Sequence, residues 1–244
     1  DCAIMAKGSP FSTVAFAGGG SRCLWQVGFW SIASSELNIK PSVVAGVSAG
    51  ASMACAIFAG TAESTLEYFK AMTRRNRRNF YITRPLRGKP AFPHYEMYRS
   101  GILYGLDGKA MKTLRRGPEI RIMISRIPSR LGPRSATMMG ILAYSVEKRV
   151  LQPLHPVWGR KLGFRPEWAV ANECASAGEL ADLIIASSCT PPFTPIQAWK
   201  GAPALDGGFV DNIPVQALPE KPRPTLVLLT RRYHEKCIPE WGER

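Results

Sequence analysis

Ser48 lies at the centre of a G-x-S-x-G pentapeptide that runs from Gly46 to Gly50. A strand-like run precedes it and a long helix-like segment follows it. In that context such a serine points its hydroxyl out of the fold. The two glycines allow the backbone of the turn and the following helix to approach closely. The N-terminus of that helix offers N–H groups and a positive dipole end to a developing oxyanion. The pentapeptide therefore predicts a nucleophilic serine.

A second glycine-rich turn, Gly18-Gly19-Gly20, follows an apolar run from Thr13 to Ala17. Successive glycine N–H groups at the end of a strand form an anion-binding nest, so these residues are candidates for an oxyanion hole. Arg22, just inside the next helix, would hold this loop or add positive charge. A dinucleotide-binding loop is disfavoured, because it needs a third glycine where the chain has Cys23.

The identity of the general base is left open by the sequence: it is either a histidine or a carboxylate. Ser48, Asp206 and His234 follow the chain order of an α/β-hydrolase triad. In that fold several strands precede the nucleophile, whereas only one is predicted here. His234 lies in a charged segment, and His94 and His155 lie beside prolines. We therefore expect all three to be solvated surface residues.

The alternative base is Asp206, which would act directly on the serine. Gly207 and Gly208 follow it and would let its backbone turn tightly towards another loop. A carboxylate is a weak base in water, with a reference pKa of about 3.9. Burial beside an apolar pocket would raise its pKa towards a useful range.

Taken in order, these motifs resemble the patatin-like phospholipase family. The motifs that carry the resemblance are Gly18-Gly19-Gly20-Ser21-Arg22, Gly46-Val47-Ser48-Ala49-Gly50 and Asp206-Gly207-Gly208. Two further stretches are also similar to that family, Ala186-Ser187-Ser188 and Asp211-Asn212-Ile213-Pro214-Val215. The resemblance extends from about Val14 to about Thr230, which is nearly the whole chain.

The resemblance implies a lipid acyl hydrolase, of the phospholipase A or lysophospholipase type, that needs neither metal nor cofactor. Ser48 would attack the ester carbonyl, and Asp206 would take its proton and return it to the leaving group. The implied oxyanion hole consists of Gly18, Gly19 and Gly20, with the N–H of Ala49 as a further donor. The supporting motif residues are Arg22, Gly46, Gly50, Gly207 and Gly208. The implied fold is a three-layer α/β/α sandwich with a mostly parallel sheet.

The hydrophobic pattern of the chain agrees with an α/β fold of one domain over residues 1–244. The first third predicts strands at Thr13–Ala17 and Val43–Val47, with helices at Cys23–Leu37 and from Ala49 to about Met72. Strand–helix alternation of this kind predicts a parallel sheet with crossover helices.

The rest of the chain falls into a basic, less regular middle region, at about residues 74–165, and a regular last third. The middle region predicts one strand at Glu119–Ile124, a short helix at Met138–Leu151 and a loop at Pro153–Gly163. The last third predicts a helix at Ala177–Ser187 and strands at Ile196–Trp199, Ala204-Leu205 and Thr225–Thr230.

The chain is strongly basic, with a net charge of +14 and a pI near 9.9. This balance favours anionic partners. No nucleic-acid recognition motif accompanies the charge, so we expect no nucleic acid. The lipid or lysophospholipid substrate is what the family resemblance implies. Arg74 to Arg78, with Phe80 and Tyr81 nearby, favours a second hypothesis: a catalytically weak or inactive module that binds an anionic membrane surface.

Six scattered cysteines contain no C-x-x-C pair, so a zinc site is not expected. Their positions in apolar runs are typical of free thiols in a reducing compartment. We therefore expect a cytoplasmic protein, and peripheral contact with a membrane stays open. The oligomeric state is also open.

Overall fold

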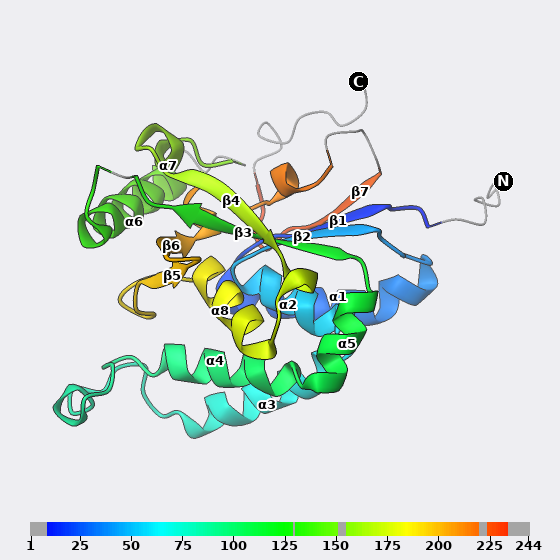
Figure 1. Cartoon of the computed structure of the whole chain (residues 1–244), viewed down its shortest axis with the longest axis horizontal. Coiled ribbons are helices and arrows are strands. Elements are labelled where there is room, and N and C mark those ends of the chain that lie inside the picture. Colours follow the sequence, from blue (N-terminus) through cyan, green and yellow to red (C-terminus); the bar gives the residue numbers. More distant parts are fainter. Residues whose placement is uncertain (1–8, 129, 151–154, 220–223, 234–244) are drawn as a thin grey trace.

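The computed structural model describes residues 9–128, 130–150, 155–219 and 224–233 of the chain (Figure 1). His234, Cys2 and Cys237 lie outside these residues. The statements below concern the described residues.

The centre of the fold is a mixed, mostly parallel sheet (Figure 1). Its strands are β1 (Thr13–Phe16), β2 (Val43–Val47), β3 (Glu119–Arg126), β4 (Arg165–Val170), β5 (Gln197–Trp199), β6 (Ala202–Asp206) and β7 (Thr225–Leu228). Hydrogen-bonded neighbours follow the path β5-β6-β3-β2-β1-β7, and β4 also pairs with β3. Strands β7, β1, β2 and β3 run parallel, whereas β4 and β6 are antiparallel to β3 and β5 is antiparallel to β6.

Helices cover both faces of this sheet and complete a three-layer α/β/α sandwich (Figure 1). They are α1 (Leu24–Glu36), α2 (Ala49–Phe58), α3 (Ala62–Arg75), α4 (His94–Gly105), α5 (Gly108–Arg116), α6 (Pro133–Val150), α7 (Trp158–Lys161) and α8 (Ala177–Ser187). Helices α1, α2 and α8 lie against one face, and α3 and α4 form an outer layer beyond them. Within the described residues, no helix combines the length and the apolar character needed to cross a membrane.

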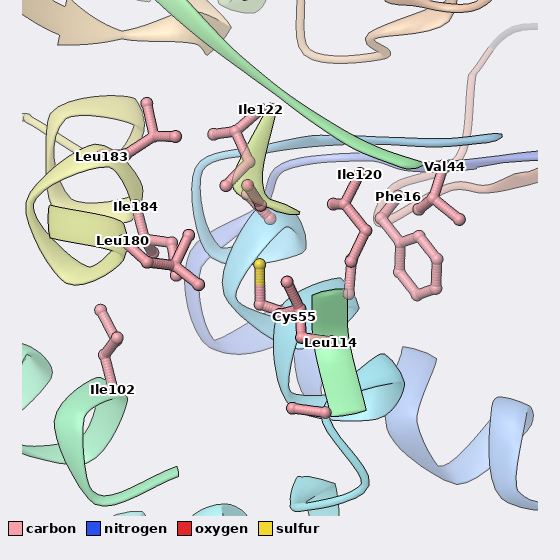
Figure 2. Packing of buried hydrophobic residues seen from close by; sticks show 14 of the residues in the cluster. Phe16, Val44, Cys55, Ile102, Leu114, Ile120, Ile122, Leu180, Leu183 and Ile184 are labelled. Carbon is pink, nitrogen blue, oxygen red and sulfur yellow. The ribbon is translucent and has the colours of Figure 1, made fainter. Parts of the chain in front are cut away.

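The larger hydrophobic core lies between the sheet and helices α1, α2, α5 and α8. Figure 2 shows Ile120 of β3 within this core beside Val44 and Phe16, and Ile122 of β3 on the side of α8. Successive side chains of a strand point to opposite faces, so Val14 and Phe16 of β1 also join this core. Ala15, between them, packs on the opposite face. Full burial of an aliphatic side chain stabilises a fold by about 1.5–3 kcal/mol. The alternation of side chains along each strand therefore fixes which face of the sheet each residue occupies.

Parts of the predicted secondary structure are confirmed with the same bounds, notably β2 and α8. The prediction of one helix from Ala49 to about Met72 is wrong. The chain instead forms α2 and α3, because it turns at Gly60 with a φ of +75°. A left-handed backbone of this kind favours glycine and ends a helix.

The basic region at about 74–165 holds more regular structure than its composition predicts. Helices α4 and α5 and strand β4 were not predicted, and α6 begins at Pro133. The predicted loop at 153–163 contains α7. Helix α5 begins at an Asp107 cap, whose side chain accepts the N–H of Ala110 at 2.7 Å. A single domain over the whole chain stays a prediction.

Candidate active site

Ser48 occupies a sharp turn between β2 and α2. Its φ of 55° and ψ of −135° are unusual for a residue with a side chain. The Ser48 N–H donates to Ser187 Oγ at 2.8 Å, and the Ser187 hydroxyl donates to the Met123 carbonyl at 2.6 Å. Ser187, at the end of α8, therefore ties the strained backbone of Ser48 to β3.

The two glycines of the pentapeptide permit close backbone contacts around this turn. A Cβ at Gly46 would lie 2.7 Å from the Cα of Ala51. A Cβ at Gly50 would lie 2.5 Å from the carbonyl oxygen of Ala17, at the end of β1. Both positions require glycine because the first turn of α2 packs directly on the ends of β1 and β2.

The strand register brings Ser48 and Asp206 together. Strand β2 pairs with β3 as far as Val47 opposite Met123, and β6 pairs with β3 from Asp206 opposite Ile124. Because β4 occupies the other edge of β3, β2 and β6 share one edge. Ser48 and Asp206 therefore meet where the carboxyl ends of β2 and β6 face each other along that edge. The Ser48 hydroxyl donates to Asp206 Oδ2 at 2.6 Å.

Asp206 has the electrostatic properties of a weak base. Burial raises the pKa of its carboxyl to about 6. Hydrogen bonds from the Ser48 hydroxyl and the Gly208 N–H, the latter 2.8 Å from Oδ1, partly oppose this rise. The Thr190 hydroxyl lies 3.4 Å from Oδ2. The carboxyl is thus ionised at neutral pH and has a higher proton affinity than an aspartate in water.

Gly18 anchors the glycine-rich loop instead of leaving its N–H free. That N–H donates to the Asn212 carbonyl at 3.0 Å, and the Asn212 side-chain amide donates to the Gly18 carbonyl at 2.8 Å. The Thr230 hydroxyl donates to the same carbonyl. The expectation that Gly18 donates to an oxyanion is therefore revised, since its N–H is already engaged.

The other N–H groups expected to donate to the oxyanion belong to Gly19, Gly20 and Ala49. They lie at the start of helical turns, where N–H groups have no acceptor within the helix. Gly19 and Gly20 begin a 3-10 turn at Gly20–Cys23, and Ala49 begins α2. Gly20 has a φ of +60°, in the left-handed region. The Arg22 side chain donates to the Gly19 carbonyl at 3.3 Å, so it contacts this loop.

An apolar cavity of about 610 Å³ opens beside the Ser48–Asp206 pair. It runs between α2, α3 and α4, and this volume lies in the range of small-ligand sites. Its apolar walls include Met53, Leu66, Phe69, Met97 and Ile102. Sequence reasoning missed this cavity, because α4 was not predicted.

The histidines differ from their expected surface positions. His94 begins α4 and lines the cavity. His155 Nδ1 lies 2.8 Å from Oδ2 of Asp211, which is fully buried. Both are half-buried: His94 faces the cavity, whereas the His155 side chain keeps 39% exposure at the surface and pairs with Asp211, a contact that was not predicted. The third histidine of the sequence, His234, falls outside the described residues.

Several residues that position the candidate site had no assigned role in the sequence. Ser187 and Asn212 lie in stretches that contributed only to the family resemblance, and Thr190 and Thr230 gave no signal at all. Within the described part of the chain, no group of three or more His, Cys, Asp or Glu residues could hold a metal ion.

The fold and this geometry define an α/β/α protein with a serine–carboxylate pair at the end of its parallel strands. The chain belongs to the patatin-like phospholipase family, whose family model matches residues 14–219. No match was found among the curated proteins. The family membership supports a lipid acyl hydrolase in general terms.

Proposed function

We propose that this chain is a lipid acyl hydrolase of the phospholipase A or lysophospholipase type, with Ser48 as nucleophile and Asp206 as its base. The observation that carries the proposal is the 2.6 Å hydrogen bond from the Ser48 hydroxyl to Asp206, at the edge of the apolar cavity. A nucleophile within hydrogen-bond reach of a base is the arrangement that acyl transfer requires.

The reaction proceeds in two half-reactions. Asp206 takes the Ser48 proton as Oγ attacks the ester carbonyl, and the N–H groups of Gly19, Gly20 and Ala49 stabilise the oxyanion. The tetrahedral intermediate expels the alcohol, which leaves with the proton from Asp206. Water then attacks the acyl-enzyme while Asp206 accepts its proton. The acid leaves and Ser48 regains its hydrogen.

The cavity suits the acyl chain of the substrate. Its apolar walls bury methylene groups, each of which contributes about 0.8 kcal/mol on leaving water. Asn76 and Asn79 also line the cavity, where α3 passes into the basic loop. These side chains offer a polar end for the glycerol or the head group.

Labelling with a fluorophosphonate probe tests the activated serine. We expect wild-type protein to be labelled at Ser48, and Ser48→Ala to lose both labelling and ester hydrolysis. Ser188→Ala is the matched control, since Ser188 also lines the cavity. Labelling that persists in Ser48→Ala would falsify the assignment.

Peripheral contact with an anionic membrane is the companion proposal. Arg74, Arg75, Arg77 and Arg78 are exposed at the end of α3, next to the cavity-lining Asn76. If the protein bound vesicles but no probe labelled Ser48, the alternative of an inactive membrane-binding module would replace the hydrolase.

A reducing, cytoplasmic location is also proposed. Its support is the four buried free thiols of Cys23, Cys55, Cys174 and Cys189.

A further inference from the structure

The loop between α3 and α4 exposes large apolar side chains. Leu86 is 86% exposed, Ile82 78% and Phe80 51%. Phe193, from the segment that follows α8, is 46% exposed. Apolar groups gathered in this way on a surface usually mark an interaction site.

This loop is built by specific contacts. The Tyr81 N–H donates to the Ala91 carbonyl at 2.9 Å, which closes the base of the loop. The Arg84 side chain donates to the Pro90 carbonyl at 2.8 Å and pairs with Glu96 at 2.6 Å. The loop projects from the body of the molecule beyond the end of α4 (Figure 1). Ile82 and Leu86 are therefore held outwards on a defined protrusion.

A chain of aromatic rings links this protrusion to the cavity. The rings of Phe80 and Phe92 lie 5.3 Å apart, and those of Phe92 and Phe193 lie 5.1 Å apart. The ring of Phe193 lies 5.4 Å from that of His94, which lines the cavity. An aromatic path of ring contacts thus runs from the exposed loop to His94 at the wall of the cavity.

All charged residues of the segment around this loop are basic. Residues 74–93 contain seven lysines and arginines and no acidic residue. The exposed basic residues are Arg74, Arg75, Arg77, Arg78, Arg87 and Lys89. Each such residue near an anionic bilayer contributes about a fivefold gain in affinity.

We propose that residues 77–93, together with Phe193, form a docking surface for an anionic phospholipid bilayer. Ile82 and Leu86 enter the interfacial region, while Arg77 and Arg78 contact lipid phosphates. The aromatic path then leads a lipid acyl chain from the bilayer to the cavity. Docking deepens the companion proposal of membrane contact, and only the last step also rests on the proposed hydrolase activity, because docking itself requires no catalysis.

Vesicle co-sedimentation tests the apolar part of this surface. The vesicles contain phosphatidylcholine alone or phosphatidylcholine mixed with phosphatidylglycerol. We expect Ile82→Ser/Leu86→Ser to lose at least tenfold in affinity for the mixed vesicles. The control is Ile32→Ser/Leu142→Ser, which changes two apolar residues on α1 and α6 that are 67% and 66% exposed and should bind like wild type. Equal losses in both double variants would overturn the proposal.

The charged part is tested with Arg77→Ala/Arg78→Ala, for which we expect about a thirtyfold loss. Arg134→Ala/Arg149→Ala removes the same charge from exposed positions on α6 and should lose less than threefold. Binding that ignores phosphatidylglycerol, or that is equally weakened by both pairs, contradicts docking through this loop. An RNA homopolymer provides the opposing test. If it bound the wild-type protein and the Ile82→Ser/Leu86→Ser variant equally, and displaced both proteins from vesicles, Arg77 and Arg78 would belong to a nucleic-acid site instead.

Two further measurements separate this proposal from the proposed function. Ser48→Ala should bind mixed vesicles like wild type. The loop variants should hydrolyse a soluble short-chain ester like wild type, which also shows that they fold. A loss of soluble-ester hydrolysis in the loop variants would attribute their weaker binding to misfolding and remove the support for docking.

Discussion

The edge of the sheet and the outer layer of helices contribute to the candidate site in different ways. At the sheet edge, strand register and backbone hydrogen bonds fix Ser48 and Asp206. In the outer layer, α3 and α4 cover the cavity with apolar side chains such as Met97 and Phe69. The chemistry therefore depends on positions with little freedom, and substrate fit depends on positions that can repack.

This difference predicts two kinds of mutational effect. Changes at the sheet edge should lower kcat, because they displace groups that act on the transition state. Changes in the outer layer should alter which substrate is accepted, or the stability, and leave the chemical step intact. The expected effects fall in size from the first region to the second.

The largest effect is expected from Asp206→Asn, which removes the proposed base. General-base catalysis contributes 10²–10⁴-fold, so we expect a loss of about a thousandfold in kcat. In wild type, kcat/KM should rise as the pH passes through about 6, where Asp206 ionises. Kinetics from pH 4 to pH 8 measure both. A wild-type profile that stays flat across pH 6 would contradict the role of Asp206.

The same variant has an opposite effect on stability. The folded pKa of Asp206 is raised above its reference of 3.8, so its contribution to stability is lost as the pH rises through about 6. Asparagine cannot ionise. Between pH 4 and pH 8, the unfolding free energy of Asp206→Asn should gain up to about 3 kcal/mol relative to wild type. Urea denaturation at both pH values measures this difference.

A smaller loss is expected from Asn212→Ala, which removes the side-chain amide that donates to the Gly18 carbonyl and keeps the backbone carbonyl that accepts the Gly18 N–H. The loop would then hold Gly19 and Gly20 less well, and kcat should fall about a hundredfold with KM little changed. The control is Gln216→Ala, since Gln216 binds Asp211 next door but does not touch the loop. An increase in KM with unchanged kcat would assign Asn212 to substrate binding instead.

Sequence reasoning worked where local pattern and backbone geometry coincide. The pentapeptide identifies Ser48, and the glycines that close contacts require are visible in the sequence. By contrast, the proximity of Asp206 to Ser48 depends on the register in which β2 and β6 pair with β3. It needs β2 and β6 to share one edge of β3, and no local pattern states this. The engagement of the Gly18 N–H by Asn212 is equally non-local.

The outer layer was harder to predict because its residues serve two environments. Helix α4 turns part of its surface to the cavity and part to α3, so its apolar residues lack one clear stripe. The exposed Ile82 and Leu86 also mimic buried residues in a hydrophobic pattern. Local sequence propensity therefore predicts an irregular structure for the region from α3 to α4, although tertiary packing gives it a regular one.

Ala56→Phe tests substrate fit from the inner wall of the cavity, which α2 forms opposite α3 and α4, since Ala56 lines the cavity eight residues after Ser48. That separation is about 12 Å along α2, so a phenylalanine there would shorten the acyl chain that fits. We expect kcat/KM for long-chain esters to fall about tenfold, while short-chain esters are hydrolysed as before. Ala71→Phe, at an exposed position on α3, is the control. Equal losses for short and long chains would mean that the acyl group does not extend along α2.

The smallest effect is expected where α3 and α4 hold each other. The Tyr68 hydroxyl and Ser100 Oγ lie 2.8 Å apart, and the Tyr68 and Tyr104 rings stack with centroids 4.2 Å apart. Tyr68→Phe keeps the stacking and loses the hydrogen bond, so the unfolding free energy should fall by only about 0.5–1.5 kcal/mol. Thermal or urea unfolding measures this loss, and kcat on a soluble ester should not change. If kcat fell as it does in Asn212→Ala, the outer layer would also fix the catalytic geometry, and the contrast between the two regions would fail.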